Sequence, residues 1–289
     1  MKVSIVGLGL IGGSIAIDLQ AKGFAIEIRG VDQNHDHISQ AKSRGFCDTI
    51  VSFEEAIQNV DLVILATPVD AILKLLPKIL DQIGSETTVT DMGSTKASMC
   101  ELVKNHPKRR QYVACHPMAG TEHSGPLAAL RGLFENRTTV ICDSESSAPR
   151  DLRRLDEMND VLGLRKVFMS SHEHDLHAAY VSHLSHISSF VLANTVLDKE
   201  RDVRTIFDLA GGGFESTVRL AKSSPQMWTP IFDQNRKHIL SALDDYMSQL
   251  EKFRDTLKAG ESEKTRDLMV EANSIKRVLQ TISIAREKK

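Results

Sequence analysis

Cysteine is sparse in this sequence, and its four cysteines lie far apart. Cys47, Cys100, Cys115 and Cys142 include no Cys-x-x-Cys pair, so the pattern favours neither a structural zinc site nor a disulfide framework. Reduced thiols are the ordinary state in the cytoplasm, which is therefore where we expect the protein.

Long apolar runs and an excess of charge are also missing. No stretch approaches the roughly 20 apolar residues of a membrane-spanning helix, and residues 2–6 already read as a strand, so we expect neither a membrane segment nor a signal peptide. The formal net charge of -2 argues against a nucleic-acid-binding protein. With 289 residues, 41% hydrophobic and 26% charged, the chain has the composition of a globular protein of two domains.

The first glycines of the chain form a dinucleotide-binding fingerprint. The apolar run at residues 2–6 is typical of a buried parallel strand, and Gly7, Gly9 and Gly12 follow in a Gly-x-Gly-x-x-Gly pattern. We expect Gly7 to allow a tight turn and Gly9 to let a pyrophosphate approach the backbone. Gly12 would let the next helix pack close to the strand.

The residues around this turn complete the predicted cofactor site. Leu10 and Ile11 lie at the start of the helix, where free N–H groups bind phosphates. A second predicted strand ends at Asp32, about 20 residues beyond the last glycine, where a ribose-binding carboxylate belongs. A carboxylate repels a 2′-phosphate, and residues 33–37 contain no lysine or arginine, so we predict NAD. Thr67 ends another buried strand on the same side.

Strands and helices alternate through the first half of the chain, which predicts an α/β fold. We expect residues 1–168 to form a Rossmann-type dinucleotide-binding domain with a mostly parallel sheet. Residues 169–289 read as helices, with more apolar stripes than one small layer can bury, so we expect an all-α domain and a homodimer. The predicted strands cover residues 2–6, 27–31, 49–51, 61–66, 87–90, 111–115 and 138–142, and the longer predicted helices cover residues 36–44, 69–83, 172–197, 226–259 and 263–285.

Two local features refine this interpretation. Pro77 falls inside the helix predicted over residues 69–83 and should kink or split it. Ser94 follows the strand over residues 87–90 and is placed to cap a helix that begins with Thr95 and Lys96.

Three predicted strands carry polar residues at their ends. Ligands of parallel sheets bind beyond the carboxyl ends of the strands, so Thr67, Ser94 and His116 should face one crevice. A neutral imidazole at His116 can accept the proton of a substrate hydroxyl, although an ordinary loop histidine remains an alternative. Arg219 can bind a carboxylate with two N–H groups, and its alternative is a surface arginine.

The other histidines raise the question of a metal site. His183 and His186 share one helix face, and His172, His174 and His177 come shortly before them. No cysteine or carboxylate lies at matching spacing, so we predict no metal. The favoured interpretation is a helix face that lines a polar crevice. The triple glycine at residues 211–213 predicts a helix break.

Five ordered motifs make a more specific resemblance. The first three are GLGLIGGS at residues 7–14, DMGSTK at 91–96 and HPMAGTE at 116–122, and the others are SHLSH at 182–186 and GGGF at 211–214, followed by Arg219 and by SPQMW at 224–228. In these motifs the chain resembles the prephenate dehydrogenase family of tyrosine biosynthesis, which includes arogenate and cyclohexadienyl dehydrogenases.

The resemblance implies a reaction and roles for residues. The reaction is NAD-dependent oxidative decarboxylation of prephenate to 4-hydroxyphenylpyruvate, in a homodimer with an α-helical dimerisation domain. His116 matches the histidine that takes the proton of the ring 4-hydroxyl, and Ser94 matches the serine that orients it. Arg219 matches the arginine that holds a substrate carboxylate. The positions that match residues on the substrate side are Ser182, His186 and Glu122.

The sequence departs from the family at one position and leaves alternatives open. Some members have an acid three residues before the matching arginine, where this chain has Ser216. Arogenate is the nearest alternative substrate, but members restricted to arogenate often lack the histidine that matches His186. A β-hydroxyacid dehydrogenase would need a catalytic lysine in the helical domain, for which no motif is present. A non-catalytic NAD sensor on the same fold is the third alternative.

Overall fold

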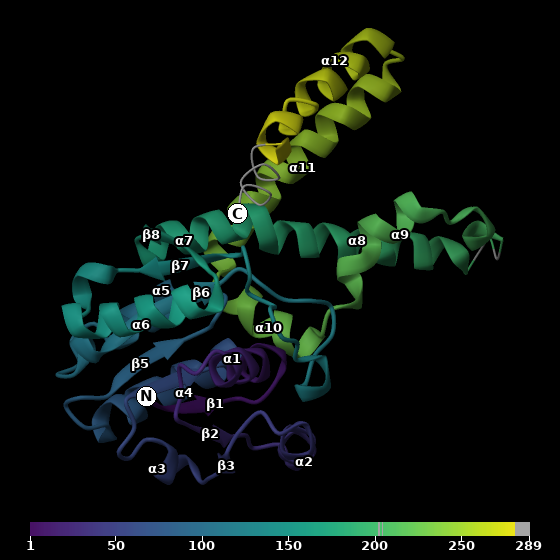
Figure 1. Cartoon of the computed structure of the whole chain (residues 1–289). Helices are drawn as coiled ribbons and strands as arrows, with labels where there is room; N and C mark the ends of the chain where they lie inside the picture. Colours follow the sequence, from purple (N-terminus) through teal and green to yellow (C-terminus); the bar gives the residue numbers. More distant parts are fainter. Residues whose placement is uncertain (202, 204, 281–289) are drawn as a thin grey trace. The chain divides into compact units, whose positions relative to one another are not determined.

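The computed structural model describes residues 1–201, 203 and 205–280. Within them, residues 1–236 form one compact unit around an eight-stranded sheet (Figure 1). The strand order is β3-β2-β1-β4-β5-β6-β7-β8, and all neighbours are parallel except β6 and β7. The prediction of an α/β fold with a mostly parallel sheet is confirmed. The strands are β1 (Lys2–Val6), β2 (Glu27–Val31), β3 (Thr49–Ile50), β4 (Leu62–Leu65), β5 (Thr88–Asp91), β6 (Tyr112–Pro117), β7 (Thr138–Cys142) and β8 (Arg165–Met169).

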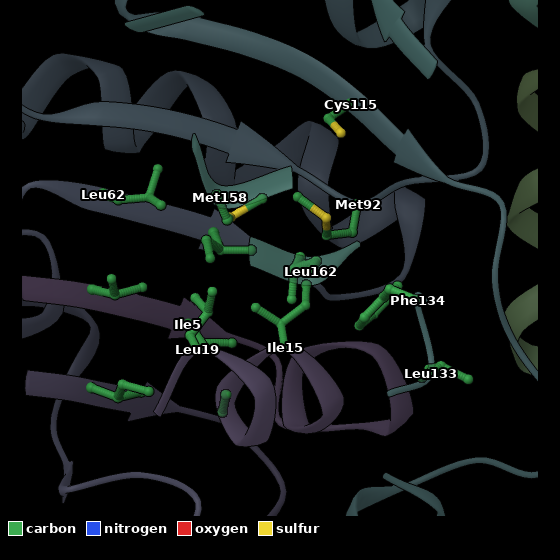
Figure 2. Packing of buried hydrophobic residues seen from close by; sticks show 14 of the residues in the cluster. Ile5, Ile15, Leu19, Leu62, Met92, Cys115, Leu133, Phe134, Met158 and Leu162 are labelled. Carbon is green, nitrogen blue, oxygen red and sulfur yellow. The ribbon is translucent and has the colours of Figure 1, made fainter. Parts of the chain in front are cut away.

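Both faces of the sheet are buried because its central strands are apolar at successive positions. In β4, Leu62 and Ile64 point into a core shared with α1 (Leu10–Ala21) and α6 (Pro149–Leu162). Figure 2 shows this core, where Ile15 and Leu19 of α1 lie next to Ile5 of β1. The alternate residues, Val63 and Leu65, face a second core, with α4 (Val69–Gln82) and α10 (Pro225–Gln234).

The remaining helices of this unit either connect strands of the sheet or follow its last strand, β8, in the sequence. A π-helical stretch over Ala179–His183 joins α7 to α8, so the helix predicted over residues 172–197 is present with this irregularity. The helices are α2 (His35–Arg44), α3 (Phe53–Ala56), α5 (Ala97–Leu102), α7 (Ser171–Ala178), α8 (Leu184–Glu200) and α9 (Gly212–Val218).

The second unit begins at Lys237 and contains most of α11 (Arg236–Lys258) and α12 (Ser262–Ala272). Gly260, with φ of 69°, separates the two helices as predicted. Of the helix predicted over residues 263–285, residues 281–285 lie outside the described part. In that part, each helix is too short or too polar to cross a membrane.

Three expectations about helices are corrected. The helix predicted over residues 226–259 is two helices, because Asn235 ends α10 and turns its buried side chain to the carbonyl of Asp175. The helix α4 runs unbroken across Pro77, so it is not split. The triple glycine at residues 211–213 starts α9 instead of interrupting a helix. The domain boundary between residues 168 and 169 stays a prediction.

Candidate active site

The turn between β1 and α1 has the geometry of a phosphate-binding loop. Gly7 has φ of 98°, and a Cβ on it would lie 2.6 Å from the carbonyl oxygen of Ala66. A Cβ on Gly12 would lie 1.9 Å from the carbonyl oxygen of Gly7, so both positions require glycine. Gly9 caps α1 from an extended conformation, and no atom of the described residues lies within 4 Å of its Cβ position. This open space over the helix start fits a pyrophosphate.

Asp32 lies beside the same turn. Its Oδ2 accepts a hydrogen bond from the N–H of Leu8 at 2.9 Å, and its Oδ1 accepts one from the N–H of Asn34 at 2.9 Å. Nδ1 of His37 is 3.2 Å from Oδ2. These contacts hold the carboxylate at the end of β2, where it can accept hydrogen bonds from a ribose.

The other predicted cofactor residues adjoin this turn. Leu10 and Ile11 are the first residues of α1, so their N–H groups have no acceptor within the helix. Thr67 follows the end of β4, and its Oγ1 is buried with no hydrogen-bond partner among the described residues. Because a buried hydroxyl without a partner is costly, Thr67 fits a position that a bound ligand completes. The residues present therefore fit a dinucleotide.

His116 lies near the end of β6, on the same edge of the sheet as Thr67 and Ser94, which follow β4 and β5. Its side chain keeps part of its surface exposed. Burial of the rest of the ring, followed by the charges of His174 and Lys96, holds the pKa of His116 well below 6.5. The imidazole is therefore neutral at physiological pH and able to accept a proton.

The expected role of Ser94 as a helix cap is wrong. The helix α5 begins at Ala97, and Ser94 makes no hydrogen bond within the described residues. Asp175 of α7 caps α5 instead, because Oδ1 accepts from the N–H of Lys96 at 2.8 Å and Oδ2 from the N–H of Ala97 at 2.9 Å. A carboxylate distant in sequence thus replaces the local cap.

A buried ion pair lies beneath this edge of the sheet. Asp91 at the end of β5 and Lys96 are both fully buried, and the Nζ of Lys96 donates to Oδ2 of Asp91. The hydroxyl of Tyr112 donates to Oδ1 of Asp91 at 2.6 Å, and the N–H of Gly93 donates to Oδ2 at 2.9 Å. This network fixes the loop that carries Ser94.

The histidines after α7 pack against Trp228 of α10. His186 stacks on the indole with ring centroids 3.7 Å apart, and its Nδ1 is 3.0 Å from the carbonyl oxygen of Ser182. His183 is 1% exposed, and burial lowers its pKa to about 4. Asn235 connects His183 to α7, since its Nδ2 lies 3.1 Å from Nδ1 of His183 and donates to the carbonyl of Asp175 at 2.6 Å.

Arg219 meets Glu122, which lies in the loop after β6. Nη1 of Arg219 is 3.2 Å from Oε2 of Glu122, and half of the arginine side chain is exposed. The pKa of Glu122 is lowered first by its own backbone N–H and also by Arg219. The hydroxyl of Ser216 donates to the carbonyl of Gly213, so this residue makes a local bond at the position where the resemblance leads us to expect an acid in some members.

Sequence reasoning missed the roles of four buried residues. The sequence suggests for His174 only a metal site or a helix face that lines a polar crevice, and it assigns Asp175, Lys96 and Asn235 no part in the site. In the structure Nε2 of His174 lies 2.8 Å from Nδ1 of His116, Asp175 accepts from the N–H of Lys96, and Asn235 lies between Asp175 and His183. The signal available was the pairing of a histidine and an aspartate next to each other on one helix. In the described residues, no group of three or more potential metal ligands comes together.

Comparison with known proteins decides the family. A family model described as the nucleotide-binding domain of prephenate dehydrogenase matches residues 15–168, and one described as its dimerization domain matches residues 170–271. The chain belongs to the prephenate dehydrogenase family. The resemblance inferred from the five motifs is therefore confirmed, and so are the enzyme class, a dehydrogenase, and its N-terminal nucleotide-binding domain.

Individual members of the prephenate dehydrogenase family agree with this assignment. The chain is 31% identical over 264 residues to prephenate dehydrogenase of Bacillus subtilis (strain 168), covering 90% of this chain and 71% of that protein. Prephenate dehydrogenase from A. aeolicus, crystallised with hydroxyphenyl propionate and NAD+, is 30% identical with a TM-score of 0.87 and coverage of 96% and 97%. Arogenate dehydrogenase of Synechocystis is 26% identical with a TM-score of 0.79 and coverage of 96% and 100%.

Proposed function

We propose that the protein uses NAD to oxidise and decarboxylate prephenate, giving 4-hydroxyphenylpyruvate for tyrosine biosynthesis in the cytoplasm. The observation that carries this proposal is the position of His116. Its neutral imidazole lies at the sheet edge that also carries the glycine turn for the dinucleotide. Oxidation of a ring alcohol needs a proton acceptor close to a hydride acceptor, and bound NAD supplies the latter.

The side chains then have separate tasks. His116 accepts the proton of the 4-hydroxyl as hydride leaves C4. Arg219 holds a substrate carboxylate, and Glu122, Ser182 and His186 lie on the substrate side. The ring carboxylate departs as CO2 and the ring becomes aromatic. The protein thus has to position the substrate, take one proton and bind one carboxylate.

Arogenate is the alternative substrate, since it differs in carrying an amine where prephenate has a keto group. Three observations support prephenate. The chain keeps His186, which relatives restricted to arogenate often lack, and it keeps Glu122. The similarity to the A. aeolicus prephenate dehydrogenase, with a TM-score of 0.87, also exceeds that to the Synechocystis arogenate dehydrogenase, at 0.79.

Initial rates with prephenate and arogenate, each with NAD and with NADP, test the proposal. We expect the highest kcat/KM with prephenate and NAD. A higher kcat/KM with arogenate would establish the alternative substrate. Absence of reduced cofactor in all four mixtures would refute dehydrogenase activity on this substrate class.

Asp32 should determine the choice of cofactor. In Asp32→Ala we expect weaker NAD binding and a smaller preference for NAD over NADP, because the carboxylate that accepts from the ribose and repels a 2′-phosphate is gone. Titration of both cofactors by calorimetry measures the change, and Asp36→Ala, an exposed acid nearby, is the control. Equal catalytic efficiency with NADP in the unmutated protein would rule out this role.

Arg219→Ala should raise the KM for prephenate strongly and leave NAD affinity near its original value. A charged hydrogen-bonded contact to a carboxylate contributes on the order of 1.5–3 kcal/mol, or roughly 10- to 100-fold in KM. Arg201→Ala is the matched control, because Arg201 is an exposed arginine that also pairs with an acid, Asp198. An unchanged KM in Arg219→Ala would remove this residue from the substrate site.

We expect a homodimer formed through the helical part of the chain. The match to a dimerization domain over residues 170–271 supports it. An apolar stripe on α11 also supports a homodimer. Its residues follow heptad-like spacing, and each is more than half exposed in the single chain: Leu240, Met247, Leu250 and Leu257. Sedimentation at micromolar concentration should give a dimer, and the double variant Met247→Glu, Leu250→Glu should give monomer. Monomer alone in the unmutated protein would contradict the prediction.

A further inference from the structure

Behind His116 lies a buried pair of residues on α7, His174 and Asp175. Nδ1 of His116 is 2.8 Å from Nε2 of His174, and Nδ1 of His174 is 2.8 Å from Oδ1 of Asp175. The two imidazole rings meet edge to face, with centroids 5.0 Å apart. His174 and Asp175 are each 2% exposed. One line of hydrogen bonds therefore runs from His116 into the protein.

Asp175 is an ionised carboxylate at the inner end of this line. Burial acts to raise the pKa of Asp175, but the bond from His174 and the N–H groups of Ala97 and Lys96 outweigh it, so the pKa is lowered. Oδ1 and Oδ2 both accept backbone hydrogen bonds. A carboxylate so bound has no proton to donate.

The charge of Asp175 determines where the protons of both rings lie. Nδ1 of His174 must carry a proton, because its partner is an acceptor. In neutral His174 the other nitrogen, Nε2, is then bare and accepts from His116. Nδ1 of His116 therefore carries a proton, and Nε2 holds the free lone pair. Within the described residues, Nε2 of His116 has no hydrogen-bond partner.

We propose that His174 and Asp175 are positioning residues for His116. They hold its proton on Nδ1, leave Nε2 as the proton-accepting atom, and take over the positive charge when the hydroxyl proton arrives. The inference rests on the proposed function, in which His116 is the base. Neither residue touches the substrate in this account, and both act through His116.

Each proton is accounted for in the transfer. The substrate hydroxyl proton bonds to Nε2 of His116, and the proton on Nδ1 of His116 moves to Nε2 of His174. His174 becomes an imidazolium next to the carboxylate of Asp175, while His116 is neutral again. After product leaves, the two protons move back in the reverse order and the added proton passes from Nε2 of His116 to water.

The surroundings of His116 make this transfer favourable. Burial, together with the neighbouring His174, Lys96 and His183, lowers the pKa of His116, so a proton is poorly held on this ring. His174 faces His116, His183 and the carboxylate of Asp175, and of these rings His174 has its Nδ1 within 2.8 Å of Oδ1 of Asp175, a direct contact that suits a cation. The positive charge therefore moves from an unfavourable position to a favourable one.

Kinetics of His174→Ala test the proposal. We expect kcat to fall roughly 10- to 100-fold, less than on loss of the base itself, with KM and NAD affinity unchanged. His177→Ala, which removes an exposed histidine from the same helix, is the matched control. Activity of His174→Ala equal to the control would overturn the proposal.

Chemical rescue separates proton transfer from filling of space. Added imidazole should restore part of the activity of His174→Ala, whereas pyrrole, a ring of the same size without a basic nitrogen, should not. Equal rescue by both would overturn the proposal. His174→Gln covers the case in which the alanine variant does not fold. Its amide can accept from His116 and donate to Asp175 but cannot take a proton, so kcat should still fall, and unchanged kcat would contradict the relay.

Nitrogen-15 NMR of the free protein gives a readout that does not depend on activity. In the unmutated protein, His116 should show a protonated Nδ1 and a bare Nε2, and in His174→Ala a mixture of both tautomers. A protonated Nε2 in the unmutated protein would overturn the inference whatever the substrate. Failure of the proposed function looks different, because the unmutated protein would then show the predicted tautomer and turn over neither prephenate nor arogenate.

Discussion

His116→Asn should lower kcat by roughly 10²–10⁴-fold, the usual contribution of a general base. Asparagine keeps a polar group of similar size at the end of β6, but it cannot accept a proton at physiological pH. NAD affinity should not change, because Gly7, Gly9 and Asp32 are untouched. The loss should therefore be confined to the chemical step.

The pH dependence gives this prediction a second test. The neutral imidazole is the active form, so activity is full above the pKa of His116 and is lost as pH falls through it. Since burial lowers this pKa well below 6.5, the acid limb should lie below that pH. The measurement is kcat against pH for the unmutated protein, His116→Asn and the exposed control His177→Asn. If His116→Asn keeps more than a tenth of the original turnover, another group is the base. The same conclusion follows if its acid limb is identical to that of the unmutated protein.

Lys96→Met should destabilise the fold by about 3–5 kcal/mol, the usual loss when one partner of a buried ion pair is removed. Lys96 and Asp91 are both fully buried, so methionine would leave the Asp91 carboxylate without its cation. The hydroxyl of Tyr112 and the N–H of Gly93 would remain as donors, but neither carries a positive charge.

Urea unfolding of the unmutated protein and Lys96→Met measures this loss. Lys104→Met is the matched control, because Lys104 also pairs with an acid, Glu101, but both side chains are about two-thirds exposed. Exposed pairs contribute little, so the control should unfold close to the unmutated protein. A loss in Lys96→Met no larger than that of the control would mean that the buried pair does not stabilise the fold.

The features predicted well from sequence are those that neighbouring residues determine. The apolar run before Gly7 and the spacing of Gly9 and Gly12 specify a strand, a turn and a helix within a dozen residues. Because carboxyl ends of parallel strands share one edge, the ends of β4, β5 and β6 could be placed on the same side before any coordinates existed.

The features missed depend on contacts between distant residues. Asp175, which caps α5, lies 79 residues after Lys96 and 78 residues after Ala97 in the sequence. Local sequence therefore indicated Ser94 as the cap. The break between α10 and α11 also depends on distant residues. Asn235 ends α10, and its side chain contacts Asp175 and His183. Apolar periodicity runs through residues 226–259 regardless, and it carries no sign of that interruption. The hydrogen bond between His116 and His174 could not be predicted either, because the two residues lie 58 positions apart.

The stoichiometry of the reaction tests the central claim most directly. The purified protein is mixed with NAD and a limiting amount of prephenate, and reduced NAD, CO2 and 4-hydroxyphenylpyruvate are measured together. The account predicts that all three form in equal amounts until prephenate is consumed. Reduced NAD without CO2 would indicate an alcohol dehydrogenase of another type, and NAD binding with no product at all would contradict catalysis of this reaction.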